Sequence, residues 1–225
     1  EQFSNGGNRD SLRYQLMRAR VQLNYENSPG LAAKRFRALL EENPQLDAAR
    51  YGLTLAQTRS GQLEAAAKTL QPLLAKAPND ITYNLAQVDL DLAANRLDAA
   101  GQRLQRLLGL YPSSYPLRQY QSELLRKQNR PADAERLLDR LLAERPGDAE
   151  LWYQQAETRG LSGNIVGVHQ ARAEYFALTG DYDQALEQLD FARRRASDNF
   201  QLAARIDARH QELAEEKRMI DKLLR

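Results

Sequence analysis

The chain lacks cysteine altogether, and it has only two histidines and one tryptophan among 225 residues. Without cysteine there can be no disulfide, no thiol catalysis and no zinc site built on thiolates. Charge of one sign is also scarce, because 32 basic and 30 acidic residues leave a formal net charge of +2. Nucleic-acid binding normally needs a basic stripe, so this balance predicts no nucleic-acid partner.

Long apolar runs are missing too. No stretch approaches the ~18 residues that a membrane-spanning helix needs, so we expect no membrane span. Glycine and proline are few, at 12 and 8, while hydrophobic residues make up 42% of the chain. This composition is typical of a soluble, helix-rich protein.

The residues that usually carry catalysis are sparse. Neither His169 nor His210 lies in a metal-ligand spacing such as H-E-x-x-H. His169 falls where an aromatic core residue is expected, so a packed, hydrogen-bonded imidazole is favoured over a metal ligand. We place His210 on the solvent side of the last helix. The chain is therefore expected to be no enzyme and to hold no cofactor or metal of its own.

What the sequence does contain is a strict repeat. A Leu-Leu pair precedes each of four evenly spaced prolines: Pro44, Pro78, Pro112 and Pro146. Their 34-residue period is that of tetratricopeptide repeats (TPRs), in which each unit is a pair of antiparallel helices. Because proline cannot extend a helix and restricts the residue before it, each of these prolines should end the second helix of a unit.

Other positions keep the same period when the units start at Arg13, Asp47, Ile81 and Tyr115. The predicted turn carries glycine or asparagine, which accept a left-handed backbone: Asn27, Gly61, Asn95 and Asn129. A small residue then marks a close helix crossing: Ala32, Ala66, Ala100 and Ala134. A large side chain follows beside it: Phe36, Leu70, Leu104 and Leu138. A fixed leucine comes next: Leu40, Leu74, Leu108 and Leu142.

The TPR signature is incomplete in two places. Only Trp152 supplies the aromatic usual at the fourth position of a unit, and the usual glycine at the eighth position is absent from the first four units. Arg20, Thr54, Val88 and Ser122 stand there instead. The superhelical pitch of these four units can therefore differ from that of a regular TPR array.

After residue 148 the period shifts by half a unit. We predict that a helix from about residue 165 to 179 is the second helix of one unit and the first of the next. The sequence thus predicts an all-α TPR solenoid of about five and a half units. Residues 1–10 would be a linker remnant, 11–148 four units, 149–199 the shifted unit, and 200–225 a C-terminal capping helix with one apolar line. A short coiled coil is the alternative for this last helix.

The first helices of stacked TPR pairs line a concave surface, so their outward positions are candidates for partner binding. Tyrosine and arginine, common in binding hot spots, occur among them. Tyr51 and Tyr153 could equally pack on a neighbouring unit. Lysine–asparagine clamps for C-terminal carboxylates are absent, which favours an extended or partly folded polypeptide as the ligand. The candidates are Met17, Tyr51, Leu55, Arg59, Leu85, Gln119, Arg126, Tyr153, Glu157 and Gln170.

The last third of the chain carries a more individual pattern. "GNIVGVHQARAEYFALTGDYDQALEQLDFARR" at 163–194, followed by "LAARIDARHQELAEE" at 202–216, resembles the end of the periplasmic M48 metalloprotease–chaperones, the BepA-like β-barrel assembly-enhancing proteases. "AARYGLTLAQTRSGQLEAAAKTLQPLLAKAPND" and "PADAERLLDRLLAERPGDAELW" extend the resemblance over most of the chain. The half-unit shift and the "ARIDARHQEL" ending are its most distinctive parts.

This resemblance implies an isolated C-terminal TPR domain, with zinc held by a protease domain that precedes it. It further implies a periplasmic location and, as partners, the outer-membrane β-barrel assembly machinery, barrel substrates and the protein's own protease domain in cis. On this view residues 1–10 are the linker left by the cut. The alternative is a free-standing TPR scaffold for envelope or pilus assembly.

Overall fold

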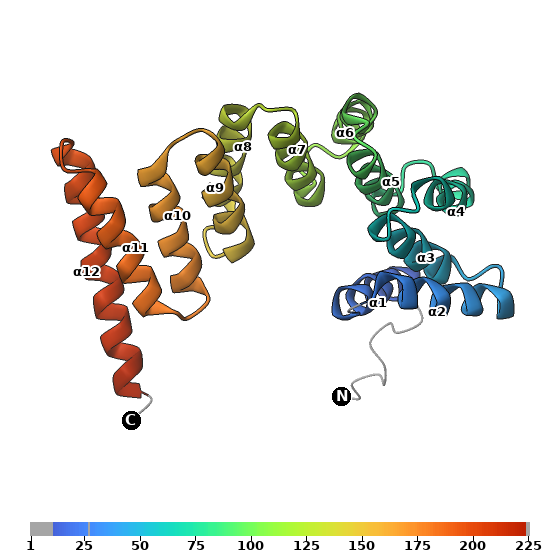
Figure 1. Cartoon of the computed structure of the whole chain (residues 1–225), viewed down its shortest axis with the longest axis horizontal. Helices are drawn as coiled ribbons and strands as arrows, with labels where there is room; N and C mark the ends of the chain where they lie inside the picture. Colours follow the sequence, from blue (N-terminus) through green and yellow to red (C-terminus); the bar gives the residue numbers. More distant parts are fainter. Residues whose placement is uncertain (1–10, 27, 224–225) are drawn as a thin grey trace, which may run out of the picture. The chain divides into compact units, whose positions relative to one another are not determined.

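The computed structural model describes residues 11–26 and 28–223, apart from the side chain of Asn24. These described residues form twelve α-helices and no strand (Figure 1), which confirms the all-α prediction. The predicted linker, Asn27 and the last two residues lie outside them. The helices are α1 (Leu12–Tyr25), α2 (Pro29–Glu42), α3 (Asp47–Arg59), α4 (Leu63–Lys76), α5 (Ile81–Ala93), α6 (Leu97–Leu110), α7 (Tyr115–Lys127), α8 (Pro131–Glu144), α9 (Ala149–Leu161), α10 (Ile165–Leu178), α11 (Tyr182–Arg195) and α12 (Phe200–Leu223).

Apart from its TPR repeats, the chain divides into two larger compact parts. From here on, residues 1–120 are called the first unit and residues 121–225 the second unit. In the first unit each helix from α2 to α5 packs on the next, and α3 also packs on both α1 and α5. The first helices of successive pairs therefore lie side by side, as in a TPR stack. The division falls inside α7, whereas the predicted boundaries at 148 and 199 follow the repeat pattern.

The turns between paired helices have the predicted left-handed backbone. Gly61, Asn95 and Asn129 have φ values of 72°, 55° and 57°, and Gly163 and Gly180 repeat the feature in the second unit with 74° and 86°. Glycine and asparagine tolerate this region better than other residues, because it brings Cβ close to the backbone. The recurrence of glycine and asparagine at these turns thus has a conformational cause.

Burial follows the repeat as closely. The four crossing alanines, Ala32, Ala66, Ala100 and Ala134, are fully buried. The large residues beside them, Phe36, Leu70, Leu104 and Leu138, are buried as well. Each second helix ends two residues before its proline; α4, for example, stops at Lys76, and Ala77 has left the helical conformation before Pro78. The predicted crossings and helix ends are confirmed.

The fourth position of three units contacts the proline that closes the preceding unit. Arg50 Nη2 donates to the Pro44 carbonyl at 2.7 Å, and Asn84 Nδ2 donates to the Pro78 carbonyl at 2.9 Å. Trp152 Nε1 donates to the Pro146 carbonyl at 2.8 Å. A polar side chain, arginine or asparagine, therefore makes the same hydrogen bond as the tryptophan. The second and third repeats thus keep this hydrogen bond without the aromatic residue of the TPR pattern.

In the second unit α10 packs extensively on both α9 and α11, as the predicted double use of this helix requires. His169 on α10 is hydrogen-bonded through Nδ1 to Gln188 Oε1 at 2.8 Å and stacks on Phe191, with ring centroids 5.4 Å apart. The packed imidazole predicted for His169 is confirmed. His210 lies on α12 with its Nε2 3.5 Å from Asp190 Oδ1.

Helix α12 covers the end of this unit over only part of its length. Ala203, Ile206 and Leu213 are buried against α11, whereas Ile220 and Leu223 are exposed. The predicted apolar line of this helix is therefore buried only in its first part, because α12 runs for 24 residues and α11 for only 14. The C-terminal turns thus extend past the helix that the earlier part of α12 covers.

Candidate functional site

The ten predicted binding residues differ widely in exposure. Met17 and Tyr153 are exposed, at 63% and 47%, and so are Arg59 and Glu157. Gln119, Arg126 and Gln170 are half-buried. Tyr51, Leu55 and Leu85 are buried, so the expectation that all three present their side chains on the concave surface was wrong. Of the ten, four are therefore exposed, three half-buried and three buried.

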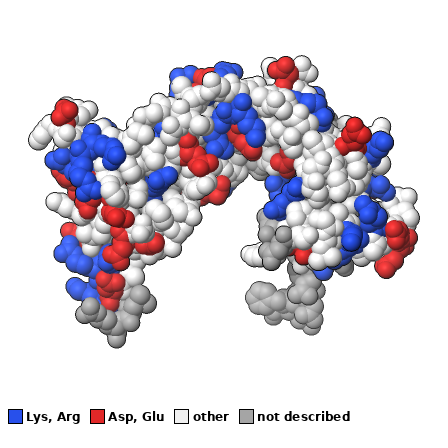
Figure 2. Space-filling view, viewed as in Figure 1, with Lys and Arg blue, Asp and Glu red and all other residues white. Residues whose placement is uncertain are grey.

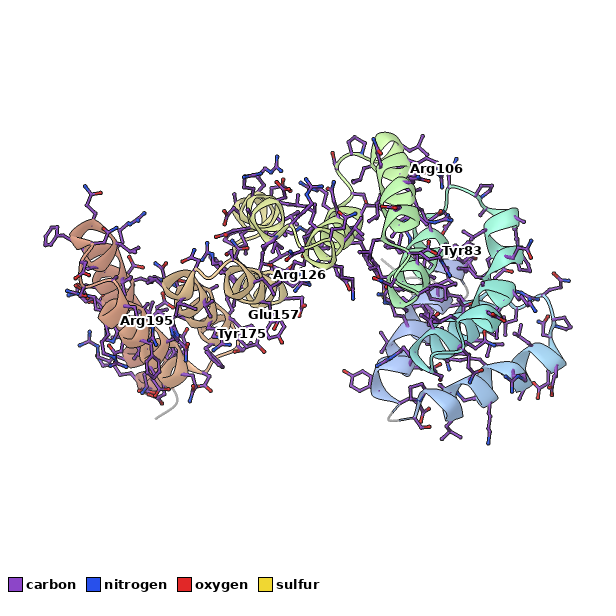
Figure 3. The ribbon with its side chains drawn as sticks, turned by 45° about the horizontal axis from the view of Figure 1, so that its top comes forward. Tyr83, Arg106, Arg126, Glu157, Tyr175 and Arg195 are labelled. Carbon is purple, nitrogen blue, oxygen red and sulfur yellow. The ribbon has the colours of Figure 1, made fainter. Side chains whose placement is uncertain are left out.

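Tyr51 is buried because the first helices pack closely on each other. It is 0% exposed, and its ring lies 6.3 Å from that of Tyr83 on α5. Tyr83 is labelled in Figure 3, on α5 of the first unit. Of the two interpretations of Tyr51, packing on the neighbouring unit is the one that the structure shows.

The first unit has a small cavity of about 250 Å³ at α1, α3 and α5. Its lining is Arg20, Leu23, Leu55, Thr58, Arg59 and Asp89, so Leu55 contributes to its wall. Arg20 Nη2 donates to the Tyr120 hydroxyl at 2.9 Å, and Arg59 Nη1 donates to the Leu23 carbonyl at 3.0 Å. Burial, with Asp89 adding to it, raises the pKa of Tyr120. Both guanidinium groups are thus engaged by the protein itself.

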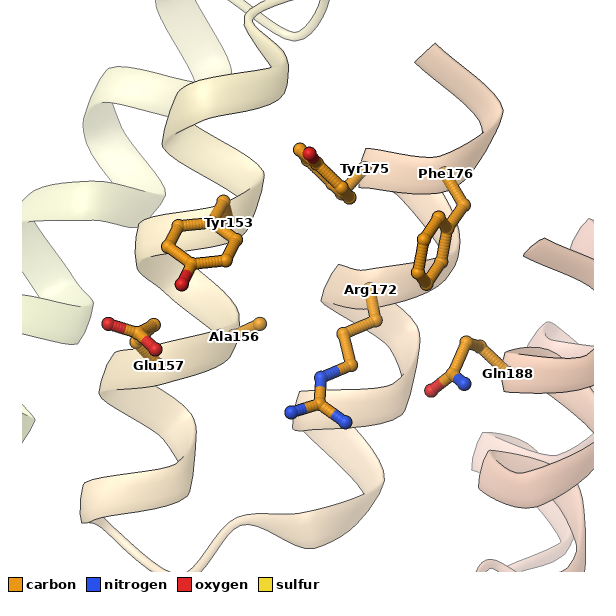
Figure 4. A pocket seen from close by; sticks show the side chains of 7 residues that line it. All are labelled: Tyr153, Ala156, Glu157, Arg172, Tyr175, Phe176 and Gln188. Atoms are coloured by element: carbon orange, nitrogen blue, oxygen red, sulfur yellow. The ribbon is translucent and has the colours of Figure 1, made fainter. Parts of the chain in front are cut away.

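The second unit contains a cavity with a different character (Figure 4). It measures about 200 Å³ and lies against α9, α10 and the middle of α11. Tyr153 comes from α9, while Tyr175 and Phe176 come from α10; the Tyr153 and Tyr175 rings are 5.8 Å apart, and the Tyr175 and Phe176 rings 5.4 Å. The remaining lining residues are Ala156, Glu157, Arg172 and Gln188. The cavity therefore combines three aromatic rings with two charged side chains.

The two charges of this cavity differ in their partners. Glu157 Oε2 lies 3.6 Å from Arg126 Nη1 of α7, and both side chains are labelled in Figure 3. Arg172 is exposed and makes no hydrogen bond or ion pair with any described residue. In Figure 4 its guanidinium extends into the space between α9 and α10. The cavity thus offers one positive charge that the protein does not neutralise.

A family model described as the tetratricopeptide repeat matches residues 23–89 and 91–157, which is more than half of the chain. The chain belongs to the tetratricopeptide repeat family. No curated protein matches it in a sequence search.

Among solved structures, the following two resemble this one. A thermophilic TPR protein from Thermus thermophilus is 22% identical, with a TM-score of 0.51, over 88% of this chain and 98% of that one. An ArsTM double mutant of MamA from strain RS-1 is 18% identical, with a TM-score of 0.50, over 83% of this chain and 96% of that one. At these identities the likeness shows the TPR fold.

The face of this TPR protein seen in Figure 2 carries charges of both signs. Basic and acidic side chains are interspersed among uncharged residues on this face. Within residues 11–26 and 28–223 there is no group of three or more His, Asp or Glu side chains that could hold a metal ion. No helix in the same described part is long and apolar enough to cross a bilayer.

Of the seven residues that line the second cavity, only Tyr153 and Glu157 were among the predicted binding residues. The five that were missed are Ala156, Arg172, Tyr175, Phe176 and Gln188. Sequence reasoning treated α10 as a first helix and selected Gln170 by the register of that role. In its other role, as the partner of α9, the same helix turns a different set of residues toward α9. A half-unit shift in the pattern therefore signals two functional faces on one helix, and both should be searched.

Proposed function

We propose that this TPR chain is a polypeptide-binding domain. The cavity of the second unit carries the proposal, because its three aromatic rings and unpaired Arg172 are accessible to a partner. Aromatic and arginine side chains are the types that most often dominate binding energy at protein interfaces. The TPR fold, whose known role is protein–protein interaction, supports the same function.

The resemblance to the BepA-like M48 metalloprotease–chaperones extends the proposal. On this basis the chain is the partner-recruiting part of a periplasmic zinc protease–chaperone. Its partners are the β-barrel assembly machinery, unfolded barrel substrates and its own protease domain, which holds the zinc. The distinctive stretches that support this assignment, 163–194 and 202–216, form α10, α11 and most of α12.

A free-standing TPR scaffold for envelope or pilus assembly is equally compatible with the fold. The two proposals differ in what precedes this chain in the full-length gene. A domain with H-E-x-x-H supports the protease–chaperone, while a gene without such a domain favours the scaffold. Cell fractionation of the tagged full-length protein tests the periplasmic location separately.

Photo-crosslinking in living cells tests the binding function. A photoreactive amino acid placed at exposed positions of the first helices, Met17 and Tyr153, should give crosslinks to polypeptide partners. The same group at Arg140, an exposed residue of the second helix α8, is the control. Barrel-assembly components among the products support the extended proposal. Equal or absent crosslinking at all three positions would contradict binding through the first helices.

A further inference from the structure

The charge and shape of the second cavity indicate which peptides it takes. Arg172 is its only charge without a compensating partner among the described residues, since Glu157 is paired with Arg126. Arginine recognises a carboxylate through two parallel N–H donors, and it does so more strongly than a neutral acceptor. The ligand should therefore bring a negative charge to Arg172.

The apolar part of the cavity defines the second requirement. Tyr153, Tyr175 and Phe176 present ring surface within one small space of about 200 Å³, which can enclose one side chain. Aromatic pairs in tilted or edge-on geometry gain beyond the burial of area alone. An aromatic side chain next to the carboxylate would fill this space.

The position of the cavity selects an internal segment of the partner. Tyr153 lies in the first half of α9 and Arg172 near the middle of α10, so the cavity lies away from the ends of these helices. A polypeptide can leave such a site in both directions. The carboxylate is therefore that of an acidic side chain within a chain.

We propose that the cavity at α9 and α10 binds an internal acidic–aromatic dipeptide of a partner protein, with the carboxylate on Arg172 and the ring against Tyr153, Tyr175 and Phe176. This inference rests on the proposed polypeptide-binding function and specifies its ligand. It gives the second unit a sequence preference of its own.

The test measures binding of short fluorescent peptides to the whole chain by anisotropy. The probe is Gly-Ser-Glu-Phe-Gly-Ser, blocked at both ends so that glutamate supplies its only carboxylate. Replacing glutamate with glutamine, or phenylalanine with alanine, should weaken binding about tenfold, the typical effect of losing a charge-assisted hydrogen bond or an aromatic anchor. High salt should weaken the glutamate peptide more than the glutamine peptide.

Variants of the protein assign each preference to a residue. Arg172→Gln should abolish the preference for glutamate over glutamine, and Tyr153→Ala the preference for phenylalanine over alanine. Arg140→Gln is the matched control, because Arg140 is an exposed arginine of the same unit that makes no hydrogen bond or ion pair with a described residue. Circular dichroism should show that all three variants stay folded, since none removes a buried side chain.

Three results would overturn the inference: a glutamate preference that survives Arg172→Gln, an equal loss with Arg140→Gln, or binding only of a peptide whose carboxylate is its free C-terminus. If no acidic–aromatic peptide binds while photo-crosslinks from the first helices persist, this inference fails and the binding function stands. Loss of both contradicts both.

Discussion

The contact between Phe36 and Gly52 shows how a single residue sets helix spacing in the first unit. A Cβ built on Gly52 would lie 2.5 Å from two atoms of the Phe36 ring, closer than carbon atoms approach in proteins. One repeat later the equivalent positions hold Leu70 and Ala86, both fully buried. A larger residue on one helix thus coincides with a smaller one on the other, as close packing of the core requires.

We expect Gly52→Ala to destabilise the protein by about 1–3 kcal/mol, because overpacking outweighs the ~1 kcal/mol that alanine gains over glycine within a helix. Urea unfolding measures the effect. Adding Phe36→Leu should recover much of the loss by recreating the pair found one repeat later. Gly109→Ala on α6 is the control, since its Cβ would meet no atom within 4 Å. Equal stability of the two alanine variants would disprove the packing argument.

Tyr83 is a second residue whose environment makes a prediction. It is only 2% exposed, and among the described residues its hydroxyl has no hydrogen-bond partner. Burial first, then Asp47 and Asp80, raises the pKa of Tyr83 to about 12. An unfolded tyrosine has a pKa of about 10. Above pH 10 the unfolded chain therefore loses this proton more readily than the folded one, and the stability that the neutral phenol provides is lost as the pH rises toward 12.

Tyr83→Phe should leave stability at pH 7 unchanged or raise it by about 1 kcal/mol, because it removes a buried hydroxyl without a partner. It should also reduce the loss of stability between pH 10 and 12. Urea midpoints measured at several pH values, for both proteins, check the two effects. A wild-type curve no steeper than that of the variant above pH 10 would exclude Tyr83 as a source of the alkaline loss.

At the scale of elements, α12 is connected to α10 by one guanidinium. Arg209 donates to Glu174 through Nε at 2.8 Å and Nη2 at 2.9 Å, and its Nη1 donates to Glu212 at 2.8 Å. These hydrogen bonds, led by that to Glu174, raise the pKa of Arg209. Planar two-point pairs of this kind are stronger than single contacts.

Arg209→Ala should lower the free energy of unfolding by about 1 kcal/mol, a modest value because the side chain is 32% exposed and solvent screens the pair. Hydrogen exchange of α12 amides should rise with it. Arg218→Ala is the matched control, since its contact with Glu215 is 3.9 Å long and both side chains are 70% exposed. If both variants unfold alike, the link between α10 and α12 contributes nothing specific.

The sequence predicted the helix ends and the turns better than it predicted other features. The period of the prolines located the ends of the second helices, and glycine or asparagine located the turns, because both residue types act through their own backbone. The double use of α10 followed from the half-unit shift. Residue burial on the first helices was harder to predict: Tyr51 and Leu85 pack on neighbouring first helices, and that spacing depends on side chains from other units.

At the scale of the whole molecule, the candidate site could be predicted only in part. Tyr153 and Glu157 were identified and do line the second cavity, while Arg172 was missed. An arginine becomes notable only once the structure shows that no carboxylate is paired with it, and no period in the sequence reveals that. The family, by contrast, could be predicted from the repeat, because each repeat has the same residue types at the positions where its helices pack.

The contact between Phe36 and Gly52 also limits how the repeats can be rearranged. A second helix with phenylalanine at the position of Phe36 must be followed by a first helix with glycine at the position of Gly52. A second helix with leucine at that position accepts alanine in the helix that follows. Swapping, duplicating or deleting units by recombination would therefore succeed only where these partners stay together. The side chains that meet between successive repeats therefore restrict the order in which those repeats can follow one another.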